Sequence, residues 1–510
     1  MTTARTRKTM YNLSTGILYQ IVVAVLSFWV RKVFLEHISV YYLGLDGVFS
    51  NLINMLCLLD FGVGTAAAYY LIKASADNDR KDLMITYTAF TYLYRVIALI
   101  LSIIGFGLYF KLDLFVNTSG YDYQVIQISF VLTFLRTIAF FLMSCPKTVL
   151  LCNQQNYYNM IVNTVITILF AFIKIIAIVQ FENFYVYLIV LLVETISNYI
   201  VIGYKFHKLY PNNELIQKDL LKSKIHEILS YGKKILVLNI NTFIFNSTDN
   251  LIISKVLGTI TVGIMSNYYM IVNAVQLFAT QVIDAATASI SNYINDKKVN
   301  DTKNIDELLS NMNFVCFSMG TFCSTCLFGL TNEFINLFFG GSFLVSKSIV
   351  FVFSLNVLAV LFENALQIFV NGRGLAADEI KYAIAMSIVN LTVSIIGAVT
   401  IGVVGVLIGT FAANLIMIWG RKHILSQRMH IDGKRYSKEF TEYFLISLIN
   451  IIVIQFVFPS SCPDLTYFIL RGIGCLVLVA LSIFLFHKTD RYSNAISLIK
   501  QFIHLRAQRN

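Results

Sequence analysis

Runs of about twenty apolar residues recur through the whole sequence, from near Tyr11 to near Phe486. At a rise of about 1.5 Å per residue, a helix of that length crosses the ~30 Å hydrocarbon core of a bilayer. Only 13% of the 510 residues are charged, whereas a soluble domain carries roughly 25%. The sequence therefore predicts an all-α integral membrane protein and leaves no stretch for a soluble domain.

The distribution of basic residues tests the number and orientation of these spans. The fourteen predicted spans are residues 11–34, 43–73, 83–110, 123–145, 156–180, 183–204, 235–257, 263–291, 310–336, 348–371, 381–400, 403–420, 440–459 and 466–487. With the N-terminus inside, 30 of the 39 Lys and Arg residues lie on the cytoplasmic face and five on the outer face. A missed span would reverse this bias downstream. We therefore expect both termini in the cytoplasm, and the net charge of +11 indicates orientation and not nucleic-acid binding.

The first twelve spans form an internal repeat with an offset of about 219 residues. Three pairs of anchors have nearly this offset: Gly44-Leu45 with Gly263-Ile264 at 219, Asn153 with Asn371 at 218, and Tyr187-Leu188-Ile189 with Val406-Leu407-Ile408 at 219. Because each copy holds six spans, both copies enter the membrane from the same side. The pattern predicts two pseudo-symmetric six-helix lobes and two additional C-terminal helices.

The predicted organisation has five parts. They are an N-lobe at 1–204, a cytoplasmic amphipathic linker at 205–234, a C-lobe at 235–420, spans 13 and 14 at 421–487, and a cytoplasmic tail at 488–510. In the linker, apolar residues such as Leu221, Ile225 and Ile228 recur at helical spacing among lysines. We interpret this as an interfacial helix on the headgroups, with a solvated linker as the alternative.

The sequence lacks the usual signatures of a soluble catalytic site. It contains no glycine-rich P-loop with its lysine, no metal-spaced histidine pair and no Gly-x-Ser-x-Gly elbow. We expect a protein that is not an enzyme, needs no cofactor or metal, and does not hydrolyse ATP by itself. The Cys323-x-x-Cys326 pair lies within an apolar run and is interpreted as packing residues.

Charged residues deep in the membrane are costly and usually mark a cavity or an ion pair. Arg95 lies ~18 Å into its predicted span, beyond easy snorkelling. Arg136 lies about ten residues from the cytoplasmic end of span four, where it either faces a cavity or snorkels to the headgroups. Asp60 and Glu194 lie near the middles of spans two and six. They either pair with the arginines or bind a coupling ion. Arginine does not deprotonate, so two deep arginines favour a phosphate or pyrophosphate ligand.

Other polar residues allow two interpretations each. Arg31 is a third candidate for the anion site, although it lies near the outer face, where snorkelling is also possible; for Lys174 and Lys255 snorkelling is favoured. Span seven carries a polar stripe that lines either a wet cavity or a helix interface, and Asp249 beside it is a further candidate for ion coupling. The stripe consists of Asn239, Asn246 and Asn250. Glu363 in span ten is either functional or a partner of loop lysines.

Three local motifs stand out at the ends of the predicted spans. They are Leu59-Asp60-Phe61-Gly62-Val63-Gly64-Thr65-Ala66, Asp249-Asn250-Leu251-Ile252-Ile253 with Gly258, Val262-Gly263 and Tyr268, and Gly402-Val403-Val404-Gly405 with Thr410. These motifs resemble those of the bacterial polysaccharide (O-antigen and capsule) flippases of the multidrug/oligosaccharidyl-lipid/polysaccharide superfamily. The resemblance extends over the whole chain through the order and spacing of the spans. It implies two six-helix lobes around a central cavity and a place in the bacterial cytoplasmic membrane.

The same resemblance implies a function. The protein would move an undecaprenyl-pyrophosphate-linked oligosaccharide to the outer leaflet by alternating access, with membrane lipids around it and the polymerase and glycosyltransferases of the pathway as candidate partners. A cation-coupled drug exporter and a peptidoglycan-precursor flippase are the alternatives within the superfamily. A membrane glycosyltransferase is a third class, which the short outward loops disfavour. The coupling ion would be a proton or sodium.

Overall fold

The computed structural model describes most of the chain. The described ranges are residues 2–60, 62–77, 79–116, 122–153, 155–211, 217–295, 302–459, 464–489 and 491–494. Several of these residues, chiefly 2–18, 234–247 and 284–289, are described by their backbone alone. Within these ranges all regular secondary structure is helical, which confirms the predicted fold class.

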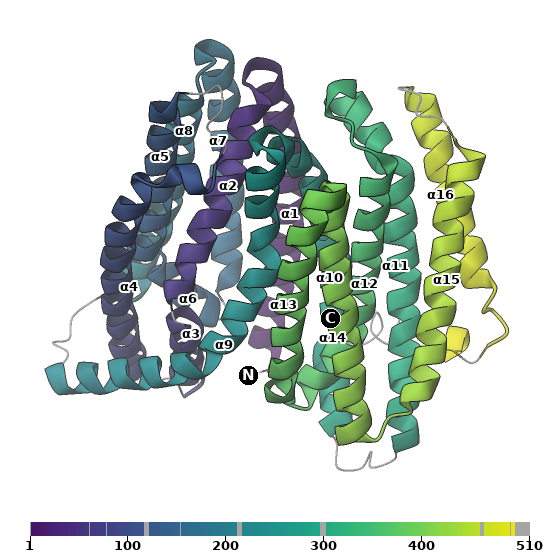
Figure 1. Cartoon of the computed structure of the whole chain (residues 1–510). Helices are drawn as coiled ribbons and strands as arrows, with labels where there is room; N and C mark the ends of the chain where they lie inside the picture. The colour runs from purple at the N-terminus through teal and green to yellow at the C-terminus, as the bar shows by residue number, and fades with distance from the viewer. Residues whose placement is uncertain are drawn as a thin grey trace. The chain divides into compact units, whose positions relative to one another are not determined.

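The helices fall into two compact units, 1–263 and 264–510. The first begins with α1 (Thr2–His37), α2 (Val40–Leu56), η1 (Cys57–Asp60), α3 (Val63–Ala76), α4 (Arg80–Tyr109), η2 (Leu112–Leu114), α5 (Tyr123–Met143), α6 (Cys145–Cys152), α7 (Asn156–Phe181), α8 (Phe184–Leu209) and α9 (Lys218–Leu257). Then follow α10 (Thr259–Asn295), α11 (Thr302–Phe338), η3 (Gly341–Phe343), α12 (Lys347–Gly372), α13 (Ala376–Ile401), α14 (Val403–Met429), α15 (Gly433–Val457) and α16 (Leu465–Phe484). Figure 1 shows their arrangement.

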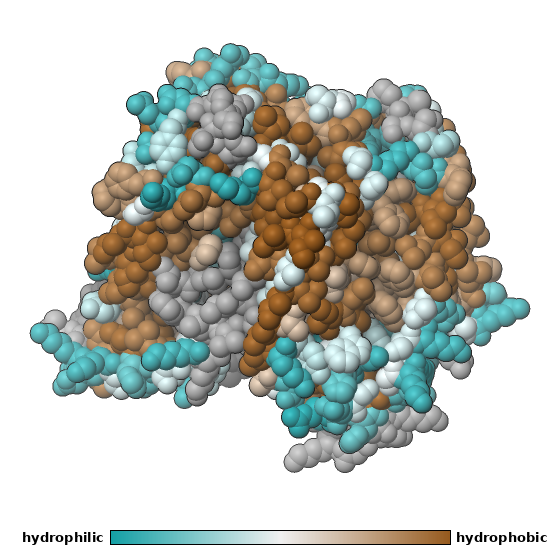
Figure 2. Space-filling view, viewed as in Figure 1, coloured by the Kyte–Doolittle hydropathy of each residue, from teal (hydrophilic) through white to brown (hydrophobic). Residues whose placement is uncertain are grey.

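Each predicted span coincides with described helical structure. Ten helices are long and apolar enough to cross a membrane, counting only the described residues: α4, α5, α7, α8 and α11 to α16. The other four spans correspond to α1, the α2–α3 pair, α9 and α10. Figure 2 shows apolar side chains covering the middle of the helices and hydrophilic side chains near their ends, as expected for helices surrounded by lipid.

The second predicted span is broken where a continuous helix was expected. Helix α2 ends at Leu56, and α3 begins at Val63 after the short η1 turn. Gly62 has a φ of +71°, and a Cβ there would lie 2.9 Å from the carbonyl oxygen of Gly232 in α9. Glycine therefore allows both the left-handed turn and the close approach of the two backbones. Broken membrane helices expose backbone ends that require polar partners.

The amphipathic linker and the seventh span form one helix, α9, of 40 residues. Its first turns run across the ends of α3 and α4 before the helix turns along the bundle (Figure 1). Lys224 binds Asp82 of α4 at 2.8 Å, and Tyr231 stacks on Tyr69 of α3. Burial opposes the charge of Lys224, but its bonds to Asp82 and Glu227 outweigh that cost and raise its pKa. The placement of this segment on lipid headgroups stays a prediction.

The boundary between the two units lies at residue 263, inside the predicted C-lobe. Helix α9 packs against α2, α3 and α4, so residues 218–257 group with the first unit, whereas the predicted C-lobe began at residue 235. The lobe boundaries at 204, 235 and 420 therefore stay predictions. Within the second unit, α15 and α16 both pack on α11. The predicted tail falls largely outside the described residues, which end at residue 494.

Candidate functional site

Charged side chains from four helices of the first unit gather around the hydroxyl of Tyr187. Tyr187 lies near the start of α8 and interacts electrostatically with Asp46 of α2, Arg31 of α1, Arg136 of α5 and Glu194 of α8. These helices are held together by direct packing of α2 on α5 and of α5 on α8, while α7 joins α1 to α8. The fold thus brings together Arg31, Arg136 and Glu194, three of the residues predicted for the site.

Glu194 is also paired with Lys174 of α7. The Nζ of Lys174 lies 3.0 Å from Oε2 of Glu194, and the two side chains are only 12% and 17% exposed. The prediction that Lys174 snorkels to the headgroups is therefore wrong, since a carboxylate inside the unit holds it. Glu194 itself was expected to pair with an arginine or bind an ion, and the lysine one helix away takes that place. Lys255 remains exposed and donates to the carbonyl of Asp113 at 3.2 Å.

Apolar packing fixes the position of Tyr187. Its ring packs edge-on against Phe34 of α1, with 4.9 Å between ring centroids. It is stacked with the ring of Phe184, with 6.3 Å between centroids. Phe34 and Phe184 belong to a buried apolar cluster that joins α1, α7 and α8, and Tyr187 packs against it. The ring of Tyr187 therefore packs against apolar side chains, and its hydroxyl faces the charged groups.

The cluster carries more positive than negative charge. With every group ionised, Arg31, Arg136 and Lys174 contribute three positive charges, and Asp46 and Glu194 contribute two negative ones. The Oδ1 atom of Asp46 is buried and has no hydrogen-bond partner in the described part of the chain. At low dielectric a net positive charge attracts an anion strongly, and arginine offers paired donors to a phosphate. The arrangement is suited to an anionic headgroup.

Arg95, the deepest arginine in the sequence, is not part of this cluster. It is exposed on α4, on the same helix face as the exposed apolar residues Tyr92, Leu99 and Ile103. The groups on which it acts electrostatically include Tyr87 and Cys145. Depth in a predicted span does not reveal which face of the helix a residue occupies, so the sequence could not place it. Its role in binding substrate stays a prediction.

Asp60 has a local structural role. Its carboxylate accepts from the backbone N–H of Gly64 at 3.2 Å and is hydrogen-bonded to the side chain of Tyr94. Asp60 therefore satisfies the first turn of α3 after the break in span two, as an acidic residue at a helix N-terminus does. The pairing of Asp60 with an arginine was one expectation from the sequence, but the partners described are Gly64 and Tyr94.

The polar stripe of span seven lies on α9. Asp249 and Asn250 are partly buried there. The Asn250 Oδ1 atom is buried without a hydrogen-bond partner in the ranges that the structure describes. The side chains of Asn239 and Asn246 fall outside the described residues. The stripe therefore stays a prediction as a cavity lining.

Arginines of α14 and α16 form ion pairs inside the second unit that the sequence did not predict. Glu363 pairs with Arg421 of α14 and not with a loop lysine, because α14 continues to Met429 where the predicted span ended at residue 420. Arg471 of α16 binds Glu333 of α11 at 2.6 Å, with 3% and 2% of the side chains exposed. The sequence shows only that opposite charges occur in separate spans. It does not show which acidic residue pairs with which arginine.

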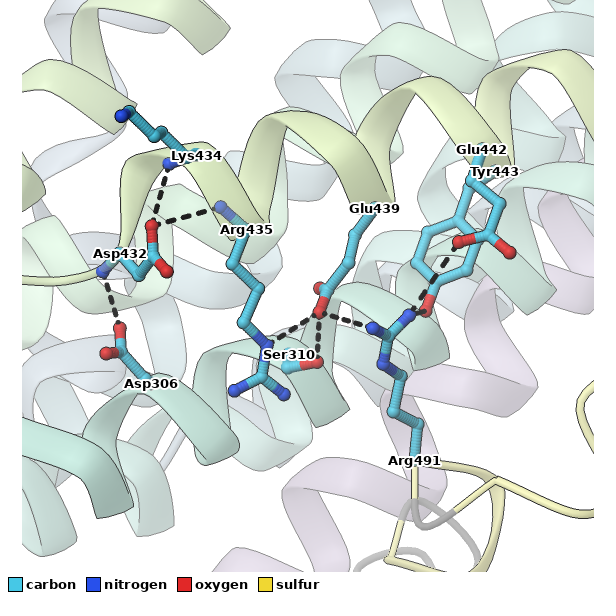
Figure 3. A network of polar contacts seen from close by, with 9 residues as sticks. All are labelled: Asp306, Ser310, Asp432, Lys434, Arg435, Glu439, Glu442, Tyr443 and Arg491. Atoms are coloured by element: carbon cyan, nitrogen blue, oxygen red, sulfur yellow. Dashed lines mark hydrogen bonds and ion pairs between the residues drawn. The ribbon is translucent and has the colours of Figure 1, made fainter.

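A third network joins the end of α15 to α11 and to the residues after α16 (Figure 3). Glu439 is 2% exposed and accepts from Ser310 at 2.8 Å and from Arg435 at 3.0 Å; its pair with Arg491 measures 3.2 Å. Asp432 caps α15 by accepting from the N–H groups of Lys434 and Arg435. These bonds hold α15 against α11 and against the residues that follow α16.

The sequence comparisons identify the family. A model of the polysaccharide biosynthesis protein family matches residues 44–350, which is more than half of the chain. This chain belongs to that family. The resemblance to polysaccharide flippases, inferred from the Asp60 and Gly402 motifs, is thereby confirmed. No curated protein matches the sequence.

Solved structures show the same fold at low identity. The lipid II flippase MurJ in an inward closed conformation matches with a TM-score of 0.67 and 15% identity, over 92% of this chain and 99% of that one. An inward-facing multidrug resistance MATE transporter of the MOP superfamily matches with a TM-score of 0.59 and 13% identity, over 82% and 98%. A MOP superfamily transporter from Pyrococcus furiosus matches at 0.50 and 13%, over 83% and 96%. The chain is thus a multi-pass membrane protein with the fold of these transporters.

Proposed function

We propose that this protein is a flippase that moves an undecaprenyl-pyrophosphate-linked oligosaccharide across the bacterial cytoplasmic membrane for surface polysaccharide synthesis. The observation that carries the proposal is the net positive, partly buried cluster around Tyr187, with members on α1, α2, α5, α7 and α8. Membership in the polysaccharide biosynthesis family supports it, and so does the MurJ-like fold. The protein acts by alternating access and forms no covalent bond with its substrate.

In this proposal, the cluster holds the pyrophosphate. Arg31 and Arg136 donate paired N–H groups to the phosphate oxygens, and the Tyr187 hydroxyl donates a further bond. Lys174 stays paired with Glu194, which fixes the position of α7 against α8. Asp46 orients the Arg31 side chain, with which it shares an electrostatic contact. Exposed Arg95 provides an additional positive charge on α4.

The orientation rests on the charge asymmetry of the loops. With both termini in the cytoplasm, the basic first turns of α9 lie on the cytoplasmic side, where the substrate is synthesised. The lipid tail remains in the bilayer while the headgroup crosses through the protein. A proton or sodium gradient drives the cycle, and membrane lipids and the polymerase and glycosyltransferases of the pathway are its partners.

A second candidate function is transport of a peptidoglycan precursor, which the match to the lipid II flippase MurJ favours. The cluster suits both substrates, because both carry a pyrophosphate. A drug exporter is less consistent with the site, since the carboxylates Asp60 and Glu194 are engaged by Gly64 and Lys174. For the Pyrococcus furiosus transporter, a reversed polarity of the binding pocket suggests a different function. Pocket charge is therefore a reasonable criterion within this fold.

The test is a deletion strain complemented with variants of the chain. Arg31→Gln and Arg136→Gln should insert at wild-type levels but abolish surface polysaccharide, because each removes paired donors from the cluster. Arg428→Gln, an equal change at an exposed pair, should restore it. Normal polysaccharide in both cluster variants would reject the assignment. Rescue of a strain lacking its peptidoglycan-precursor flippase would favour the second candidate.

A further inference from the structure

Three helices of the second unit meet around one buried arginine. Arg421 of α14 binds Glu363 of α12 through an Nη1 atom at 2.7 Å and Glu379 of α13 through Nε at 2.5 Å. The three side chains are 5%, 16% and 10% exposed, in the order Arg421, Glu363 and Glu379. Both carboxylates use the same guanidinium, one from each side.

This triad has one negative charge too many. Two carboxylates and one guanidinium leave a net charge of −1 if all are ionised, in a site shielded from water. An uncompensated buried charge costs several kcal/mol, and a carboxyl group avoids that cost by taking up a proton. The protonation state of the triad therefore depends on whether a second cation pairs with either carboxylate.

In the described part of the chain no second cation forms an ion pair with Glu363 or Glu379, because the other basic groups on these helices contact different partners. On α14, Lys422 donates to Ser437 at 2.9 Å, His423 stacks on Trp419, and Arg428 binds Asp378 at the surface. On α13, Lys381 lies over the ring of Tyr382. On α15, Arg435 is committed to Glu439, and Cys316 is the nearby titratable group of α11.

Tyr436 of α15 adds a polar group at the same place. It is 4% exposed, and its buried hydroxyl has no hydrogen-bond partner among the residues described. The hydroxyl lies within electrostatic reach of Glu363. A protonated Glu363 carboxyl would have an O–H group to donate, whereas a carboxylate would not. The Tyr436 hydroxyl could accept a hydrogen bond from a protonated carboxyl group, which is consistent with a proton bound at the triad.

We propose that Glu363 and Glu379 share one proton at neutral pH, so that the triad with Arg421 is a neutral, single-proton binding site. Binding forms an O–H bond between a carboxylate oxygen and a proton from water, with no change of oxidation state. The site joins α12, α13 and α14, so loss of the proton leaves a buried negative charge and weakens their packing. The second unit thereby responds to proton concentration, whichever lipid-linked substrate the first unit carries.

Infrared spectroscopy of the purified protein in lipid bilayers tests the proposal. The wild type at pH 7 should show a protonated-carboxyl C=O stretch that is lost in both Glu363→Gln and Glu379→Gln. Either change removes one negative charge, so the remaining carboxylate balances Arg421 and releases the shared proton. Asp378→Asn, on the same helix but paired with exposed Arg428, is the matched control and should retain the band.

A second measurement keeps the test independent of band assignment. The shared proton is bound in the folded state and lost on unfolding, so wild-type stability should fall as pH rises through the titration of the site. Both glutamine variants should flatten that dependence, and Asp378→Asn should not. The proposal would be overturned if the wild type lacked the protonated-carboxyl band. It would also be overturned if both glutamine variants kept the band and the wild-type dependence of stability on pH. Such a result would leave the proposed function untouched, because that function is tested separately by surface polysaccharide in the complemented strains.

Discussion

The two copies of the repeat share a framework but carry their charged groups at different positions. At an offset of 219, every member of the cluster around Tyr187 corresponds to an uncharged residue in the second copy. The pairs are Arg31 with Asn250, Asp46 with Met265, Arg136 with Leu355, Lys174 with Val393, Tyr187 with Val406 and Glu194 with Ala413. In the reverse direction, Glu363, Glu379 and Arg421 correspond to Ser144, Met160 and Ile202. By our proposals, the two copies have specialised, the first for an anion and the second for a proton.

The last helix pair of each copy shows how packing allows this difference. In the second copy, α13 and α14 are joined at Gly402, and Gly397 contacts Gly405 backbone to backbone. In the first copy, the corresponding residues are Ile178 and Val186, and α7 and α8 are joined at Glu182 with a φ of 44°. Small residues let membrane helices approach closely. Larger side chains keep α7 and α8 apart and leave room for the Lys174–Glu194 pair.

The largest expected effect comes from filling the glycine contact. Gly405→Leu should destabilise the protein by about 3 kcal/mol or more, because its Cβ meets the Gly397 backbone, which cannot move as a side chain does. Val186→Leu at the corresponding position should cost under about 1.5 kcal/mol. Thermal unfolding of the purified variants measures both. Equal losses would show that the two helix pairs pack alike.

The next effect comes from breaking the charge pair of the first copy. Glu194→Gln alone should cost about 3 kcal/mol, because Lys174 remains buried without its counterion. The double variant Lys174→Met with Glu194→Gln makes the first copy resemble the second and should recover most of that loss. Chemical denaturation of the single and double variants gives the coupling energy. If the double variant were no more stable than Glu194→Gln, the Lys174–Glu194 pair would not contribute to stability as described.

A smaller effect is expected on affinity. Arg136→Gln should weaken binding of a pyrophosphate lipid roughly 10- to 100-fold, since a hydrogen bond to a charged group contributes about 1.5–3 kcal/mol. Leu355→Gln, at the matching position of the second copy, should leave affinity unchanged. Titration of the lipid into protein in nanodiscs measures both values. A loss in Leu355→Gln as large as in Arg136→Gln would place the headgroup in both copies.

The smallest effect is expected at the surface pair of Arg428 and Asp378. Arg428→Gln should change neither stability nor lipid affinity measurably, because exposed ion pairs contribute little. The same unfolding and titration experiments apply. A clear loss of lipid binding would extend the anion site to the second unit.

The sequence predicted the spans well because apolar length and loop charge are additive properties of the chain. It singled out Arg31, Arg136 and Glu194, which the structure brings together, because charges in apolar runs are conspicuous. It could not place Arg95 on an exposed face or join Lys174 to Glu194, since those outcomes depend on helix rotation and on which helices pack together. Asp46 and Tyr187 went unnoticed because a residue near a span end, or a tyrosine in a membrane helix, looks ordinary in isolation. The break before Gly62 depends on Gly232, more than 150 residues away.

The most direct test of the central claim is transport in proteoliposomes. The wild type should move a fluorescent undecaprenyl-pyrophosphate oligosaccharide from one leaflet to the other, as measured by its accessibility to an external reductant. Arg31→Gln combined with Arg136→Gln should fold and insert but leave the lipid in its original leaflet, while Arg428→Gln should transport it normally. Wild-type transport by the double variant would contradict the claim that the cationic cluster of the first unit binds the substrate.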